Sequence, residues 1–220
     1  MKFKRITLLC GHYGSGKTNV ALNMAYALKE QCDNVAIADL DIVNPYFRTK
    51  DSAKELENKG IKLIASEYAG TNVDIPAMPQ EMYSLTDDKS VKAIIDVGGD
   101  DRGALALGRI APAILEENDY EALFVINKFR PLTPDAESTL EVMAEIEIAG
   151  KIKFTGIVNN SNLGIETSAE DVLGSVEYAN SISNATGLPV VCTAVTERLY
   201  SELKGKIENL LPLKLQRKIN

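Results

Sequence analysis

The stretch Gly11-His12-Tyr13-Gly14-Ser15-Gly16-Lys17-Thr18 matches the pattern G-x-x-x-x-G-K-[ST] of a phosphate-binding loop. An apolar run at residues 6–10 precedes it, and a helix-like pattern begins at Lys17. This strand–loop–helix context favours a functional loop over a chance glycine-rich turn. Glycines let successive backbone N–H groups converge on phosphate oxygens, and the positive end of the following helix adds attraction. We therefore expect all eight residues to bind the phosphates of a nucleotide.

Two side chains of this loop have separate expected tasks. Lys17 brings a compact positive charge to the β- and γ-phosphates, which makes it a candidate catalytic residue. The Thr18 hydroxyl holds the place that binds Mg²⁺ in this pattern. A nucleoside triphosphate with Mg²⁺ is therefore the expected ligand.

Short β-branched apolar runs alternate with helical patterns along the whole chain. The expected strands are Ile6–Cys10, Val35–Asp39, Lys62–Ala65, Ala93–Val97, Ala122–Ile126, Thr155–Asn159 and Pro189–Ala194. The expected helices are Lys17–Glu30, Phe47–Asn58, Arg102–Glu116, Pro134–Ile148, Ala169–Thr186 and Glu197–Leu210. Near-continuous apolar strands are typical of a parallel sheet buried on both faces. The sequence thus predicts an α/β fold with a three-layer, doubly wound, mostly parallel sheet of the P-loop NTPase type. We expect one domain over residues 1–220, with a surface loop and a short helix in Glu67–Lys89.

The composition argues against several classes of protein. A net charge of −7 argues against nonspecific nucleic-acid binding. No apolar run approaches the roughly 18 residues of a membrane span. Cys10, Cys32 and Cys192 form no local pair and His12 is the one histidine, so no site built on a cysteine pair or several histidines is expected. The first residues lead directly into a strand without a signal peptide, so we expect a cytoplasmic protein with reduced cysteines.

Carboxylates follow two of the expected strands. Asp39 and Asp41 come after the second strand run, and Asp96 comes after the core of the fourth, three residues before Gly99. Either site alone could be a turn or a helix cap. The carboxyl ends of parallel strands form the ligand crevice of such sheets, so both sites could face the phosphates. We expect Asp39, Asp41 and Asp96 to act with Thr18 at Mg²⁺, Asp96 through water, and the Gly99 N–H to reach the γ-phosphate.

With these residues the chain resembles the ParA/MinD-like ATPases, the P-loop group that includes the nitrogenase iron protein and the arsenite-pump ATPase. The resemblance implies that Asp41 orients the attacking water and that residues 42–48 and 96–102 are the two switches. It further implies that Asn160, with Asn159 as its neighbour, contacts adenine and that the backbone near residues 189–195 contacts the base. It also implies a homodimer.

His12 departs from this family. The family has a second lysine at this position, which reaches the nucleotide of the partner subunit. A neutral imidazole carries no fixed charge near pH 7. The missing cation could come from Arg48 or Arg102, although both could equally be solvated surface charges, and His12 could contribute its backbone N–H alone.

Asn127-Lys128-Phe129-Arg130 resembles the guanine-reading pattern N-K-x-D but ends in arginine. Guanine needs a hydrogen-bond acceptor at that last position, so ATP is favoured over GTP. Lys128 and Arg130 are then expected in the loop before the next helix.

The C-terminal stretch from Leu203 to Ile219 mixes leucines with basic residues. It could be a membrane-touching amphipathic tail like that of MinD proteins. Pro212 interrupts any long amphipathic face, so a closing helix with a solvated basic end is favoured.

Two classes of function remain open at this point. The first is a slow, Mg²⁺-dependent ATPase that acts as a nucleotide-dependent switch on a protein partner. The second is a small-molecule ligase of the dethiobiotin or cobyrinate synthase type. The chain shows no cysteine-centred glutaminase region, which favours the switch. ATP turnover that needs no small molecule and is stimulated by a protein would separate the two.

Overall fold

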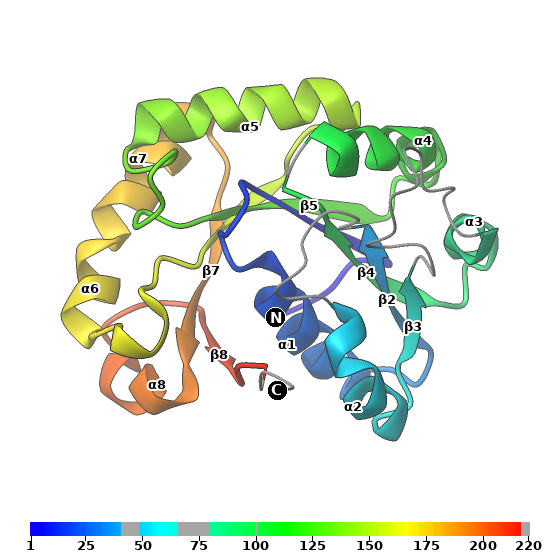
Figure 1. Cartoon of the computed structure of the whole chain (residues 1–220), viewed down its shortest axis with the longest axis horizontal. Coiled ribbons are helices and arrows are strands. Elements are labelled where there is room, and N and C mark those ends of the chain that lie inside the picture. The colour runs from blue at the N-terminus through cyan, green and yellow to red at the C-terminus, as the bar shows by residue number, and fades with distance from the viewer. Residues whose placement is uncertain (41–48, 66–79, 100, 217–220) are drawn as a thin grey trace.

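The computed structural model describes residues 1–40, 49–65, 80–99 and 101–216 (Figure 1). Within these ranges it describes the backbone alone for Lys50, Asp51, Gln80, Asp101 and Arg102. Asp41, Arg48 and the rest of the expected first switch lie outside the described residues.

Eight parallel strands form one sheet in the described part of the chain, in the order β3-β2-β4-β1-β5-β6-β7-β8. The strands are β1 (Ile6–Cys10), β2 (Val35–Leu40), β3 (Lys62–Ala65), β4 (Lys92–Val97), β5 (Tyr120–Ile126), β6 (Gly156–Asn159), β7 (Val190–Thr196) and β8 (Leu210–Leu213). The seven expected strands are confirmed, and β8 is an addition. The strand order reverses around β1, which lies between β4 and β5, and such a reversal opens a crevice at the carboxyl ends of the strands.

Helices cover both faces of the sheet (Figure 1). They are α1 (Lys17–Lys29), α2 (Ala53–Asn58), α3 (Gln80–Asp87), α4 (Asp101–Glu117), α5 (Ala136–Gly150), α6 (Ala169–Gly174), α7 (Val176–Thr186) and α8 (Glu197–Leu203), with 3-10 turns η1 (Thr49–Ser52) and η2 (Gly164–Glu166). Residues of α3, α4, α5 and α7 share one buried apolar cluster with the sheet, and residues of α1 and α2 share another. This arrangement confirms the three-layer, doubly wound fold. The short helix expected within Glu67–Lys89 is α3.

The expected helix Glu197–Leu210 is wrong in its second half. Helix α8 ends at Leu203, and Gly205 turns the chain with a φ of 86°. The chain then adds β8 to the edge of the sheet, where Leu211 and Leu213 are buried and Pro212 between them is exposed. An edge strand tolerates proline because one of its sides has no ladder partner. No described helix is long and apolar enough to cross a membrane.

Two other expected helices are shorter or interrupted. The stretch Ala169–Thr186 forms α6 and α7, which meet at Ser175. The fully buried Ser175 hydroxyl donates to the Val172 carbonyl and accepts a bond from Asn159, which stabilises this junction. The described part of Phe47–Asn58 is the turn η1 followed by the six-residue α2.

Candidate nucleotide site

The loop at residues 11–18 connects β1 to α1 and packs closely on two neighbouring strand ends. A Cβ atom at Gly11 would lie 2.4 Å from the Val125 carbonyl oxygen of β5. A Cβ atom at Gly16 would lie 2.4 Å from Asn160 Nδ2, and the Gly16 φ of 86° disfavours other residues as well. These two glycines therefore let the loop approach β5 and the end of β6.

Lys17 lies inside this loop. Its side chain is buried, and Nζ donates hydrogen bonds to the carbonyl oxygens of Gly11 at 3.0 Å and His12 at 3.2 Å. Gly99, two residues after the end of β4, packs against the loop next to the Lys17 ammonium group. A Cβ atom there would lie 2.6 Å from Tyr13 N and 2.8 Å from Lys17 Nζ. The structure thus brings Gly99 and Lys17 together, as the sequence predicts.

Asp39 on β2 and Asp96 on β4 are paired in register, and Asp96 is in turn paired with Leu9 of β1. Side chains alternate along a strand, so each carboxylate shares the sheet face of the residue two positions earlier, Ile37 or Ile94. Those two isoleucines pack in the same apolar cluster as α1. Both carboxylates therefore lie on the face that holds the phosphate loop, and both are buried.

Thr49 is a site residue that the sequence analysis missed. Its hydroxyl donates to Asp96 Oδ2 at 3.2 Å, and the side chain is fully buried. Thr49 comes directly after the segment expected to be the first switch. It lies 47 positions before Asp96 in the sequence, so the contact between them is seen only in the folded chain. A threonine next to an expected switch was the signal available in the sequence.

Cys10 directly precedes the loop, and the charges of Lys17 and Asp96 both affect the pKa of its thiol. Burial raises the pKa of its thiol to about 12, with Lys17 opposing and Asp96 adding to the rise. The thiol therefore stays protonated at neutral pH and packs as an apolar group in the cluster that the sheet shares with α3, α4, α5 and α7.

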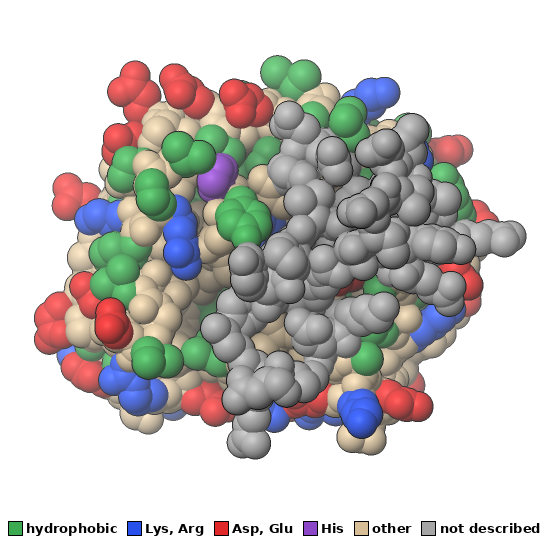
Figure 2. Space-filling view, in the orientation of Figure 1, with side chains coloured by type: hydrophobic (Ala, Val, Ile, Leu, Met, Phe, Trp, Pro, Cys, Tyr) green, Lys and Arg blue, Asp and Glu red, His purple; other side chains and the backbone are tan. Residues whose placement is uncertain are grey.

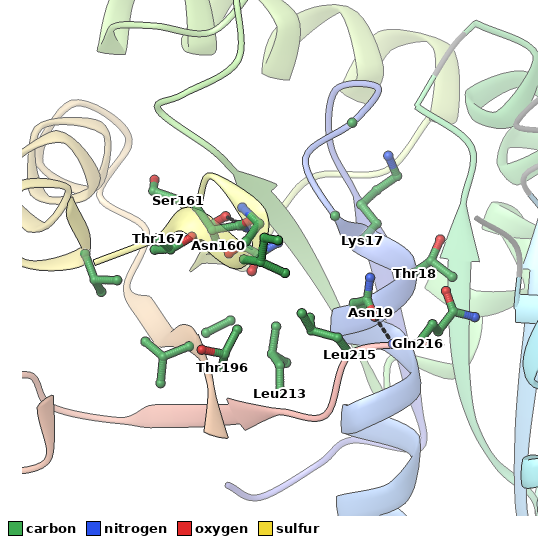
Figure 3. Close-up of a pocket in the computed structure, with 18 of the residues that line it drawn as sticks. Lys17, Thr18, Asn19, Asn160, Ser161, Thr167, Thr196, Leu213, Leu215 and Gln216 are labelled. Carbon is green, nitrogen blue, oxygen red and sulfur yellow. Dashed lines mark hydrogen bonds between the residues drawn. The ribbon is translucent and has the colours of Figure 1, made fainter. Parts of the chain in front are cut away.

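A cavity of about 690 Å³ extends from the loop along the carboxyl ends of β6, β7 and β8. Figure 3 shows Lys17 and Thr18 at one side of it, Asn160 and Ser161 across from them, and Leu213 and Leu215 at its lower wall. Its apolar end is lined by Ile165, Val172, Ala194, Val195, Leu199, Leu213 and Leu215. The cavity is polar beside the phosphate loop and apolar at the far end, as a nucleoside requires.

Asn160 and Asn159 have different surroundings. Asn160 lines the cavity, and its Nδ2 donates to the Ser15 carbonyl oxygen at 2.7 Å. This bond leaves the buried Oδ1 without a hydrogen-bond partner in the described part of the chain. Asn159 does not line the cavity: its amide donates to Ser175 and accepts bonds from Ser161 N and Oγ. Asn159 thus holds the strand end, and Asn160 faces the ligand space.

The C-terminal residues complete the cavity wall by binding α1. Asn23 accepts from the Lys214 N–H at 2.9 Å and donates to the Lys214 carbonyl at 3.0 Å. Asn19 accepts from the Gln216 N–H at 3.0 Å, the dashed bond in Figure 3. The sequence analysis missed this wall, although the four-residue spacing of Asn19 and Asn23 indicates one polar face on the helix.

The remaining predicted residues of the loop differ in their exposure. His12 is half-buried, and its Nδ1 is 2.9 Å from the Tyr13 carbonyl oxygen. Figure 2 shows this histidine among hydrophobic side chains on the face that carries the loop. Tyr13 is exposed and lines the cavity, whereas Ser15 is buried. Among described residues, no group of three or more His, Cys, Asp or Glu side chains is placed to hold a metal ion.

A match to a protein-family model identifies the family of this chain. Residues 6–189 match the family model "CbiA: CobQ/CobB/MinD/ParA nucleotide binding domain". The chain belongs to this family. As a CobQ/CobB/MinD/ParA domain it is a P-loop nucleotide-binding domain, and the resemblance found in the sequence is confirmed. A comparison with curated protein sequences finds none that matches.

Solved structures of FtsY share the fold of this CobQ/CobB/MinD/ParA domain. FtsY from Thermotoga maritima is 19% identical, with 87% of this chain and 62% of that chain covered and a TM-score of 0.58. FtsY from Mycoplasma mycoides is 16% identical, with 89% and 61% covered and a TM-score of 0.57. The signal recognition particle receptor FtsY from Elizabethkingia anophelis, in complex with GDP, is 16% identical, with 99% and 62% covered and a TM-score of 0.52. The chain thus spans about three fifths of these proteins, and the likeness shows the fold alone.

Proposed function

We propose that this chain is a Mg²⁺-dependent ATPase that acts as a nucleotide-operated switch on a protein partner. The pairing of Asp39 with Asp96 on the face of the phosphate loop supports it best. Strand-end carboxylates next to a lysine-containing loop are the arrangement that phosphoryl transfer uses to position a metal–nucleotide complex.

Each residue has a proposed role in hydrolysis. Lys17 exchanges its two loop carbonyl partners for oxygens of the β- and γ-phosphates, while Thr18, Asp39 and Asp96 are the residues that would hold Mg²⁺. The bound ion supplies charge neutralisation across those phosphates. Gly99 offers its N–H to the γ-phosphate, and Asp41, outside the described residues, orients the attacking water.

Asn160 supports adenine as the base. Its Nδ2 is engaged with Ser15, and its acceptor Oδ1 is buried without a hydrogen-bond partner among the described residues, so Oδ1 is the atom left for a ligand to engage. The 6-amino group of adenine is a donor that matches this acceptor, whereas the 6-oxo group of guanine is an acceptor and does not. Arg130 stands where guanine recognition would need an acceptor.

The test is nucleotide binding and turnover by the purified chain. We expect calorimetry to show MgATP binding that is tighter than MgGTP binding. Lys17→Ala is expected to weaken ATP binding at least about tenfold, because it removes a charge-assisted contact in a largely dry site. Unchanged ATP affinity in that variant would contradict the proposal.

Hydrolysis and the switch role need a second variant. Asp41→Ala is expected to keep ATP bound and to slow single-turnover hydrolysis by a factor of about 10²–10⁴. Proteins retained on the ATP-loaded Asp41→Ala chain, but released when ADP replaces ATP, would identify the partner. Turnover that depends on a small molecule instead of a protein would favour the ligase alternative.

A further inference from the structure

Arg130, in the turn between β5 and α5, lies against the middle of the phosphate loop. A Cβ atom at Gly14 would be 3.6 Å from Arg130 Nε, 3.7 Å from Cδ and 3.8 Å from Cζ. The same side chain lines the 690 Å³ cavity together with Gly14 and Lys17. The guanidinium therefore lies beside the loop at its cavity side. The loop position after the strand was expected and is confirmed, but this contact was not predicted.

The charge of Arg130 has no counter-charge within the described residues. Its Nε is buried without a hydrogen-bond partner, and the side chain makes no ion pair there. A buried donor on a cation is costly unless an acceptor satisfies it, and such an exception in a folded protein calls for an explanation. An anionic ligand in the cavity that Arg130 lines would bring acceptors and a counter-charge to its guanidinium.

The wall of the cavity carries charge of one sign. Among its described residues, Lys17 and Arg130 are the charged ones, and none is aspartate or glutamate. Both cations lie beside the loop, whereas Val195, Leu199 and Leu213 line the other end. The positive charge thus gathers where a phosphate chain would lie.

We propose that Arg130 contacts the phosphate chain of the bound nucleotide from within the same subunit. This inference rests on the proposed nucleotide function and adds a second cation to it. A guanidinium has a planar set of donors that fits phosphate oxygens in pairs. Arg130 thereby supplies, inside one subunit, a fixed positive charge that His12 lacks at the family's second lysine position.

The side chain can be changed without removing the turn that carries it. Arg130 N donates to the Asn127 carbonyl at 3.2 Å, and its own carbonyl accepts from Thr133 N at 3.1 Å. Both bonds use backbone atoms and remain in Arg130→Ala. Lys128 provides a matched control, since it is a cation of the same turn that does not line the cavity and donates to the Gly174 carbonyl at 3.2 Å.

The experiment compares three probes: ATP, inorganic tripolyphosphate and adenosine. Calorimetry or NMR titration measures their affinities for the wild-type chain, Arg130→Ala, Arg130→Lys, Lys128→Ala and Lys17→Ala. We expect Arg130→Ala to weaken ATP and tripolyphosphate binding about 10- to 100-fold, as a charged hydrogen-bond donor is lost. Adenosine binding is expected to remain unchanged, Arg130→Lys to be intermediate, and Lys128→Ala to match the wild type.

The outcomes separate the two proposals. Equal weakening of ATP and adenosine in Arg130→Ala, or no weakening of ATP, would overturn the role of Arg130 while leaving the nucleotide site intact. A wild-type chain that binds neither ATP nor tripolyphosphate, or whose ATP binding is insensitive to Lys17→Ala, would overturn the proposed function and this inference with it.

Discussion

The side-chain amide of Asn160 donates a 2.7 Å hydrogen bond to the carbonyl oxygen of Ser15, which ties the end of β6 directly to the phosphate loop. Asn160 is almost fully buried, and this bond engages its Nδ2, which leaves the buried Oδ1 without a hydrogen-bond partner in the described part of the chain. The Asn160 side chain thus connects the phosphate-binding loop to the part of the cavity wall where we propose that the base binds.

Asn160→Ala should reduce the preference for ATP over GTP. The variant lacks the Oδ1 acceptor proposed for the adenine amine, and one such hydrogen bond accounts for about a tenfold difference in affinity. Calorimetry with both nucleotides measures the ratio. Asn180→Ala, at an exposed position of α7, is the control and should keep the wild-type ratio. An unchanged ratio in Asn160→Ala would count against base recognition by Asn160.

Gly99→Ala should disrupt ATP binding through the backbone of the loop. The added Cβ would lie 2.6 Å from Tyr13 N and 2.8 Å from Tyr13 Cα, so the loop has to move. We expect ATP affinity to fall at least about tenfold, with a lower melting temperature, as for other overpacked sites. Gly174→Ala, where nothing lies within 4 Å of the new Cβ, should behave as wild type. Tight ATP binding by Gly99→Ala would show that the loop adjusts freely.

Cysteine labelling should distinguish the partly exposed thiol of Cys32 from the buried thiols of Cys10 and Cys192. Burial raises the pKa of both Cys10 and Cys192 from 9.0 to about 12, so the reactive thiolate is absent at pH 8, and Cys32 is less buried. Iodoacetamide at pH 8 should add one label to the folded chain, at Cys32, and three in denaturant. Mass spectrometry of peptides assigns the sites. Rapid labelling of Cys10 in the folded chain would contradict this burial.

The same two thiols should lower stability at alkaline pH. Between pH 9 and about 12 the folded chain keeps both protons while the unfolded chain releases them. Their contribution to the free energy of unfolding is therefore complete below pH 9 and is lost as pH rises toward 12. Denaturant titrations at pH 8 and pH 10.5 should show a larger decrease for the wild type than for a variant with Cys10→Ala and Cys192→Ala.

Asn23→Ala should loosen the C-terminal wall of the cavity. It removes two hydrogen bonds to the Lys214 backbone, at a cost of about 1–3 kcal/mol in unfolding free energy. Hydrogen–deuterium exchange should rise at residues 213–216, and ATP affinity should fall because Leu213 and Leu215 line the cavity. Asn184→Ala, exposed on α7, is the matched control. Unaltered exchange at residues 213–216 would mean that β8 pairing alone holds the segment.

His12→Lys should strengthen an ATP-dependent dimer. It restores a fixed cation where the family has one, and charge neutralisation matters most at a low-dielectric interface. Sedimentation with ATP and with ADP is expected to show a weak wild-type dimer, a stronger His12→Lys dimer and little change for His12→Ala. A tight wild-type dimer that persists without the charges of Arg48, Arg102 and Arg130 would refute this electrostatic argument.

The sequence predicted the parts of the site that are local in the chain. The loop at residues 11–18 is one continuous pattern, and Asp39 and Asp96 follow strands whose apolar runs are plain. Their pairing follows from parallel strands ending at the same edge. Thr49 and Arg130 have no such pattern, because their contacts with Asp96 and Gly14 depend on how distant turns meet. β8 was missed because its four residues have a weak alternation and contain Pro212.

The attachment of the last strand to α1 has a consequence for how the site is assembled. Asn19 and Gln216 are separated by 197 positions, yet their bond helps to close the same cavity that the loop at residues 11–18 opens. Contacts over such sequence separations form late, and a chain on the ribosome folds from its N-terminal side first. The loop can thus form early in synthesis, whereas the base end has its full wall only once Leu213 and Leu215 have emerged. Tight nucleotide binding would then mark a chain whose sheet is complete to its eighth strand.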